Sequence, residues 1–146
     1  MSQETPQAKR ELAEAVFDAL NARDFEALGD MPFHPDMEFR SALTAVEGGT
    51  VYHGIQGLRQ WANDIDSVFE DFNNELIGFH EVDDERAIVV TRVTGRARTS
   101  GVPVDERRAQ IWTWRNDKMW RNDVFSDPRE AFKAVGLSEE SFARDN

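Results

Sequence analysis

Asp123 is a carboxylate that could transfer a proton if its strand places it inside the fold. Strand alternation would place Met119, Arg121, Asp123 and Phe125 on one face of a strand. Because Met119 and Phe125 are apolar, we expect this face to point inward and to desolvate Asp123 partly, which suits a general base. The alternative is a purely structural role for Asp123, either in an ion pair with Arg92 or Arg121 or in an exposed position at the strand edge.

Arg92 is the second charged side chain that we expect at an interior site. It follows Ile88 and Val90 on one face of its strand, which indicates an inward guanidinium. Arginine cannot act as a base at neutral pH, so its catalytic role would be to orient Asp123 or to stabilise negative charge. Pairing with a carboxylate is the structural alternative.

Aromatic and polar side chains at helix and strand spacing are candidates for the walls of a pocket. Gln110, Trp112 and Trp114 share a face of one strand, and Trp114 is more typical of core packing. Phe17 and Trp61 could form one wall or be pure packing. Taken with the family resemblance given below, the residues expected to bind substrate are Phe17, Phe39, Ser41, Trp61, Gln110, Trp112 and Phe125.

Several kinds of site are excluded by the residues present. There is no cysteine, and His34, His53 and His80 are scattered with no HxH or HExxH spacing, so we expect no metal. Neither GxGxxG nor GxxxxGK occurs, so there is no phosphate-binding loop and no cofactor is expected.

Length and charge narrow the function further. The 146 residues predict a single domain over 1–146, with a core of about residues 8–137 and a polar tail over 138–146. The net charge of −11 disfavours nucleic acid and anionic membranes. No segment reads as a secretory signal or a membrane span, so a cytoplasmic location is the default expectation.

Hydrophobic periodicity predicts helices early in the chain and strands late. Helices are expected to about residue 22, over 24–28 and over 57–69, with a short strand over 37–41. The period then changes to two, which predicts an antiparallel meander over 73–82, 86–98, 104–115 and 118–125, with a bend or bulge at Gly95. A last helix begins after Asp127 and ends at Gly136.

This order predicts an α+β fold in which helices gather on one face of a curved, mainly antiparallel sheet. The concave side of such a sheet holds either side chains or a ligand. The small-residue face over 87–97 could form a dimer contact or be covered by the helices.

Five segments carry a family resemblance. They read ALNARDFEAL, HPDMEF, YHGIQGLRQW, SGVPVDERRAQIWTWRNDKMWRNDVFSD and REAFKAVGL. Together they resemble the SnoaL-like polyketide cyclase and ketosteroid isomerase-like group of the nuclear transport factor 2-like superfamily. The resemblance implies a cone in which three to four helices wrap a curved mixed sheet around an internal pocket. It also implies a homodimer.

The active sites of the group match this sequence only in part. The ketosteroid isomerase residues would fall at Ser41, Phe17 and Gln110, and none of the three matches. The limonene epoxide hydrolase pattern resembles Arg92 and Asp123 but has Thr94 in place of its second carboxylate. The cyclases use an aspartate late in the sheet, and Asp123 resembles that position.

The sequence therefore predicts a cofactor-independent cyclase, isomerase or hydrolase that acts on a small, apolar, oxygenated metabolite through Asp123 and Arg92. Two alternatives stay open. One is a non-catalytic binding protein with the same pocket, and the other is a dimeric interaction protein whose pocket is filled by side chains.

Overall fold

The computed structural model describes residues 6–41, 50–125 and 127–136 of the chain. Its elements, in chain order, are the helices and strands α1 (Pro6–Ala22), α2 (Phe25–Gly29), β1 (Phe33–Ser41), β2 (Thr50–His53), α3 (Gly54–Val68), β3 (Phe69–Glu81), β4 (Arg86–Ala97), β5 (Pro103–Arg115), β6 (Lys118–Phe125) and α4 (Pro128–Ala134). The strand β2 has no counterpart in the sequence prediction, because four residues are too few to show an alternation.

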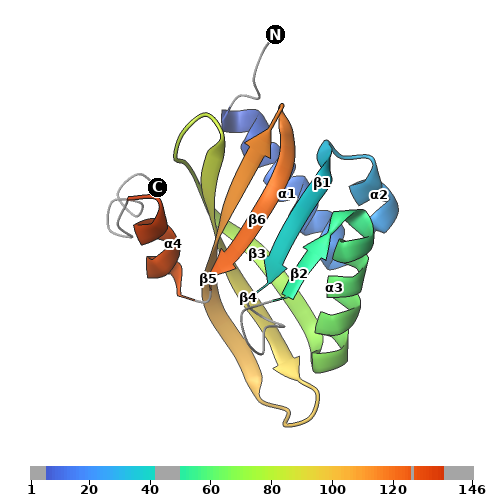
Figure 1. Cartoon of the computed structure of the whole chain (residues 1–146). Coiled ribbons are helices and arrows are strands. Elements are labelled where there is room, and N and C mark those ends of the chain that lie inside the picture. Colours follow the sequence, from blue (N-terminus) through green and yellow to red (C-terminus); the bar gives the residue numbers. More distant parts are fainter. Residues whose placement is uncertain (1–5, 42–49, 126, 137–146) are drawn as a thin grey trace.

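The strands form one sheet in the order β2-β1-β6-β5-β4-β3 (Figure 1). The pair β1 and β6 is parallel, and the other neighbours run antiparallel. Asn116 and Asp117 both have positive φ angles, of 55° and 62°, which lets the predicted tight turn join β5 to β6. The predicted α+β fold with a curved mixed sheet is confirmed.

Helices lie on both faces of this sheet. The helices α1, α2 and α3 pack on the concave face, while α4 packs on the opposite face of β4 and β5 (Figure 1). The prediction that all helices gather on one face is wrong for α4. Its Ala131 and Phe132 are fully buried against Ile88, Val90 and Ala109 and form a second, separate core cluster.

Local sequence explains how the helices are held on the concave face. Val16, Phe17 and Leu20 form the buried stripe of α1. The side chain of Asp24 accepts a hydrogen bond from the backbone N–H of Ala27 and so caps α2, as the sequence predicts. At the start of α3, a Cβ at Gly57 would lie 2.9 Å from the backbone of Tyr52, so only glycine allows this close contact with β2.

The irregular part of the sheet is β3 rather than β4. The pairing of β3 with β4 shifts register between Glu70 and Asn73 and again between Leu76 and Gly78. Asp71 lies in the first of these bulges with a φ of 55°. Gly95, where the sequence placed a bulge, instead lies opposite this irregularity, and a Cβ there would meet the Cα of Phe72 at 3.3 Å. The bend is present, but on the partner strand.

The small-residue face of β4 points into the main core. Ala87, Val89 and Val93 are buried in the cluster that α1 and α3 cover, so the helices cover this part of the face, which was the alternative to a dimer contact. The homodimer implied by the resemblance stays a prediction. Among the described residues, no helix is both long and apolar enough to cross a bilayer.

Candidate functional site: an aromatic cavity with an amide pair

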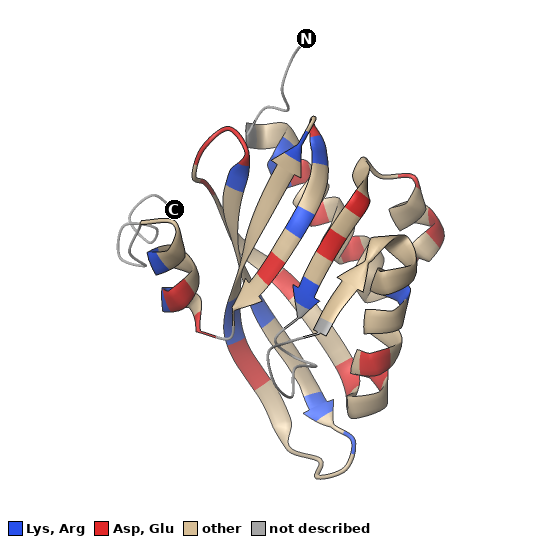
Figure 2. Ribbon diagram, viewed as in Figure 1, with Lys and Arg blue, Asp and Glu red and all other residues tan. Residues whose placement is uncertain are grey.

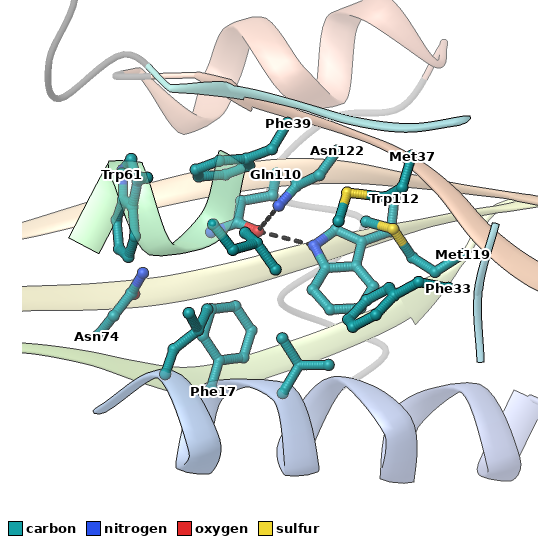
Figure 3. A pocket seen from close by; sticks show the side chains of 13 residues that line it. Phe17, Phe33, Met37, Phe39, Trp61, Asn74, Gln110, Trp112, Met119 and Asn122 are labelled. Atoms are coloured by element: carbon teal, nitrogen blue, oxygen red, sulfur yellow. Dashed lines mark hydrogen bonds between the residues drawn. The ribbon is translucent and has the colours of Figure 1, made fainter. Parts of the chain in front are cut away.

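A cavity lies between α1, α3 and the concave face of the sheet (Figure 3). The cavity has a volume of about 20 Å³. Side chains therefore fill most of the cone, and the remaining space suits one or two water molecules. The cavity is lined by Val16, Phe17, Leu20, Phe33, Met37, Phe39, Leu58, Trp61, Asn74, Gln110, Trp112, Met119 and Asn122.

Aromatic rings make up much of the wall. Phe17 of α1 packs on Trp112 of β5 with ring centroids 5.9 Å apart. Phe39 of β1 meets Trp61 of α3 edge to face at 5.3 Å. These four residues and Gln110 were expected to bind substrate, and the structure brings all five to one cavity although they come from four different elements.

A hydrogen-bonded amide pair is the polar part of the cavity. The indole Nε1–H of Trp112 donates to Oε1 of Gln110 at 2.7 Å, and Nδ2–H of Asn122 donates to the same oxygen at 2.9 Å (Figure 3). An indole nitrogen is a donor only, so the Gln110 oxygen must face Trp112. The Asn122 nitrogen must then face that oxygen, and the orientation of both amides follows from one tryptophan.

This arrangement leaves an acceptor without a partner. Oδ1 of Asn122 is buried and has no hydrogen-bond donor within reach in the described part of the chain, and the same holds for Oδ1 of Asn74. Both residues are only 6% exposed and both line the cavity. A buried, unsatisfied carbonyl oxygen costs about 1–3 kcal/mol. Two residues that line the cavity therefore each carry a buried amide oxygen without a donor among the described residues.

Asp123 lies outside the cavity. The pairing of β5 with β6 runs from Trp114 opposite Met119 to Thr113 opposite Arg121, so Trp120 is an extra residue in β6. This bulge reverses the alternation, because Met119 and Asn122 line the cavity while Asp123 points to the other face. The prediction that Met119 and Asp123 share a face is wrong for this reason.

On the outer face, Asp123 is held by two arginines. Arg121 Nε donates to its carboxylate at 2.9 Å, and Arg40 Nε lies 3.5 Å from it. Figure 2 shows charged residues of both signs along β1 and β6, where these side chains originate. The geometry favours the structural alternative for Asp123, which is an ion pair. Its partners are Arg121 and Arg40, and Arg92 takes no part.

Arg92 and Phe125 also lie away from the cavity. Arg92 shares a face with Ile88 and Val90 as predicted, but this is the outer face, and its half-exposed guanidinium donates two hydrogen bonds to Asp105 at 2.7 and 2.9 Å. These bonds lower the pKa of Asp105. Phe125 packs against the cluster beneath α4. The side chain of Ser41 lies outside the described residues.

The exchange of Asp123 for asparagine tests this placement. We expect Asp123→Asn to change the free energy of unfolding by no more than about 1 kcal/mol, because the carboxylate is partly exposed and makes only surface ion pairs. Binding of any ligand inside the cone should be unchanged. Urea denaturation measures the change in stability and ligand titration measures binding. A loss of binding without a loss of stability would show that Asp123 belongs to the binding site.

The sequence analysis did not identify Asn122, Asn74 or Met37 as cavity residues, whereas it placed Met119 on an inward face, as the structure does. Asn122 was hidden by the unrecognised bulge at Trp120. Asn74 lies at the start of the strand expected over 73–82, and alternation there could have placed it inward. In the described residues, no group of three or more acidic, histidine or cysteine side chains is arranged to hold a metal ion.

A cone-shaped α+β domain with an aromatic interior defines the class of this protein, and comparisons with known proteins agree. A model of the SnoaL-like domain matches residues 13–122. No curated protein matches the chain. The chain belongs to the SnoaL-like domain family, as the sequence resemblance indicates.

Solved structures show the same fold at low identity. TerC, co-crystallised with polyporic acid, is 20% identical with a TM-score of 0.69, covering 90% of this chain and 98% of its own. A ketosteroid isomerase-like protein from Catenulispora acidiphila, in complex with trimethylamine, is 15% identical with a TM-score of 0.67, covering 89% and 95%. An NTF2-like protein from Burkholderia thailandensis is 17% identical with a TM-score of 0.68, covering 86% and 95%.

Proposed function

We propose that this protein binds a small, mostly apolar molecule that carries a hydroxyl or N–H group, and that it holds this molecule inside the cone. The observation that carries the proposal is Oδ1 of Asn122, which has no donor among the described residues and belongs to a residue that lines a cavity walled by aromatic rings. An apolar pocket with a few fixed polar groups is the usual form of a small-molecule site.

The amide pair determines what kind of polar group fits. Gln110 already accepts two hydrogen bonds through its oxygen, and Asn122 donates to it, so rotation of either amide would break a bond that exists. Asn122 therefore presents an acceptor of fixed orientation. A ligand hydroxyl or N–H satisfies it, whereas a ligand ether or methyl group leaves it unpaired.

Room for the ligand has to come from movement of side chains. Met37 and Met119 both line the cavity, and methionine has three rotatable bonds and adapts easily to a new neighbour. We infer that these two side chains withdraw when the ligand enters. A single aromatic ring is the smallest ligand that would contact several of the walls at once.

The comparisons support binding of organic small molecules on this fold. Two of the similar structures contain one, polyporic acid in TerC and trimethylamine in the Catenulispora protein. A proposed polyketide cyclase from Sinorhizobium meliloti has the same fold at 22% identity, with a TM-score of 0.59 and coverage of 79% and 94%. This similarity keeps an enzyme of the cyclase or isomerase type within the family's range.

Acid–base chemistry through Asp123 is not the function that the geometry favours. Among the described residues that line the cavity, none is aspartate, glutamate or histidine. General acid–base catalysis needs such a group within hydrogen-bond reach of the reacting atom. We therefore propose a carrier or sensor role, with binding rather than turnover as its activity.

A matched pair of probes tests the proposal. p-Cresol and p-xylene differ only by a hydroxyl in place of a methyl group, and the indole N–H resonances of Trp61 and Trp112 report their binding by NMR. We expect p-cresol to bind about tenfold more tightly than p-xylene, which corresponds to about 1.4 kcal/mol.

The variant Asn122→Leu provides the control. It should abolish the preference for p-cresol while changing the free energy of unfolding by no more than about 1 kcal/mol, because it removes an unsatisfied oxygen together with one hydrogen bond. Failure of both probes to move either indole resonance would overturn the proposal. Equal affinities in the parent protein would overturn the role of Asn122.

A further inference from the structure

A second, smaller cavity continues from the first toward the start of β5. Its volume is about 10 Å³, and it shares four lining residues with the first cavity: Phe39, Trp61, Asn74 and Gln110. What it adds is charge, because Arg108 lines it together with Thr91. The function proposed above makes no use of either side chain.

Arg108 is positioned by the same strand as Gln110. It precedes Gln110 by two residues in β5, so both side chains point into the cone. The Arg108 side chain is only 13% exposed. Its Nη2–H donates to Glu106 at 2.9 Å, but the Glu106 side chain is 52% exposed and lies at the rim. The Arg108 guanidinium is thus held in the wall of a cavity that Asn74, Thr91 and Gln110 also line, and the Glu106 carboxylate is about half exposed.

Thr91 of β4 lies next to Arg108 on the adjacent strand. The two residues are direct partners in the β4–β5 ladder, so their side chains leave the same face of the sheet next to each other. Thr91 is fully buried, and its hydroxyl has no hydrogen-bond partner among the described residues. The second cavity therefore combines a charged donor with a neutral hydroxyl, the pairing that suits an oxygen with negative charge.

We propose that the ligand is an organic anion, with a carboxylate or enolate oxygen received by Arg108 and Thr91 and an apolar body in the first cavity. The inference rests on the proposed binding function and makes its ligand class specific. Arg108 presents several donors in a fixed fork, which suits a carboxylate better than a lysine ammonium would. The donor group that satisfies Asn122 would lie on the same molecule, across Gln110 from the anionic oxygen.

The net charge of the protein makes this preference unusual. With a formal charge of −11, the surface as a whole repels anions. A preference for an anion therefore has to arise locally, at Arg108. The long-range field of the protein repels anions, so by itself it would favour the neutral or cationic member of any matched pair of ligands.

The test compares 4-hydroxybenzoate with 4-hydroxybenzamide, which have nearly the same shape, both carry a hydroxyl donor for Asn122, and differ in charge. Titration at pH 7 is followed by the indole resonances of Trp61 and Trp112. We expect the carboxylate to bind about tenfold more tightly than the amide, equivalent to about 1.4 kcal/mol. Arg108→Gln should reduce that ratio to about one, and Arg108→Lys should retain part of it.

Two further variants keep the result interpretable. Glu106→Gln removes the competing carboxylate and should tighten binding of 4-hydroxybenzoate, even if Arg108→Gln does not fold. Arg92→Gln removes a guanidinium from the outer face and should leave the ratio unchanged. A carboxylate that binds no better than the amide overturns this inference while the proposed function stands. Absence of binding by both probes overturns the proposed function itself.

Discussion

Replacing Gln110 with leucine is expected to lower the free energy of unfolding by about 2–4 kcal/mol, because two buried donors would lose their shared acceptor. The indole N–H of Trp112 and the amide N–H of Asn122 both bond to the Gln110 oxygen. Leucine fills a similar volume, so the loss would come from the hydrogen bonds rather than from a new cavity. Urea denaturation followed by tryptophan fluorescence measures the change.

The control for this variant is Gln56→Leu. Gln56 is exposed on α3, so the same chemical change there should alter the free energy of unfolding by no more than about 0.5 kcal/mol. Gln110→Leu should also abolish the preference for p-cresol, because Asn122 would be free to rotate its amide. A Gln110→Leu variant as stable as the parent protein would show that the amide pair is not the structural centre of the cavity.

Truncating Phe132 to alanine should lower the free energy of unfolding by about 3–5 kcal/mol, the usual cost of emptying a fully buried aromatic site. Phe132 is 0% exposed and lies at the centre of the cluster between α4 and the outer face of β4 and β5. Without it, α4 has only Ala131 as a fully buried anchor. Thermal denaturation measures the loss, and hydrogen exchange in α4 shows whether the helix undocks.

The neighbouring residue Lys133 supplies the control for α4. It is exposed, so Lys133→Ala should change the free energy of unfolding by no more than about 0.5 kcal/mol. If Phe132→Ala costs less than about 1 kcal/mol, the second cluster contributes little and the outer face is open to other partners. Ligand binding inside the cone should be retained in both variants, because α4 lines neither cavity.

The sequence predicts the elements better than their faces. The apolar stripe of α1, the Asp24 cap and the Asn116–Asp117 turn are local signals, and each appears in the structure. The inward and outward faces of β6 were not predicted correctly, because the extra residue at Trp120 reverses which side chains point inward. A bulge of this kind changes no composition and follows from pairing with β5, so a single strand read alone cannot reveal it.

The prediction that Arg92 points inward was wrong for a different reason. Residues Ala87 to Val90 are all fully buried, because helices cover both faces of β4 at this point. A strand buried on both faces has no alternation between apolar and polar residues. The parity that grouped Arg92 with Ile88 and Val90 was therefore right, but nothing in the segment indicated which face α4 would cover.

The cavity itself could be predicted only as a set of walls. Phe17, Phe39, Trp61 and Trp112 are large apolar residues on the buried sides of their elements, so their convergence follows from the fold. The polar partners depend on tertiary geometry. The side-chain oxygen of Gln110 is satisfied and that of Asn122 is not. This difference follows from contacts between strands and not from the residue types.

A crystal structure of the protein with p-cresol tests the central claim most directly. We predict that the ring lies inside the cone between Phe17 and Trp61, with its hydroxyl within about 3.2 Å of Oδ1 of Asn122. The thioether side chains of Met37 and Met119 should have moved away from their present positions. p-Cresol found only on the outer surface, with the interior still filled by side chains, would contradict the account.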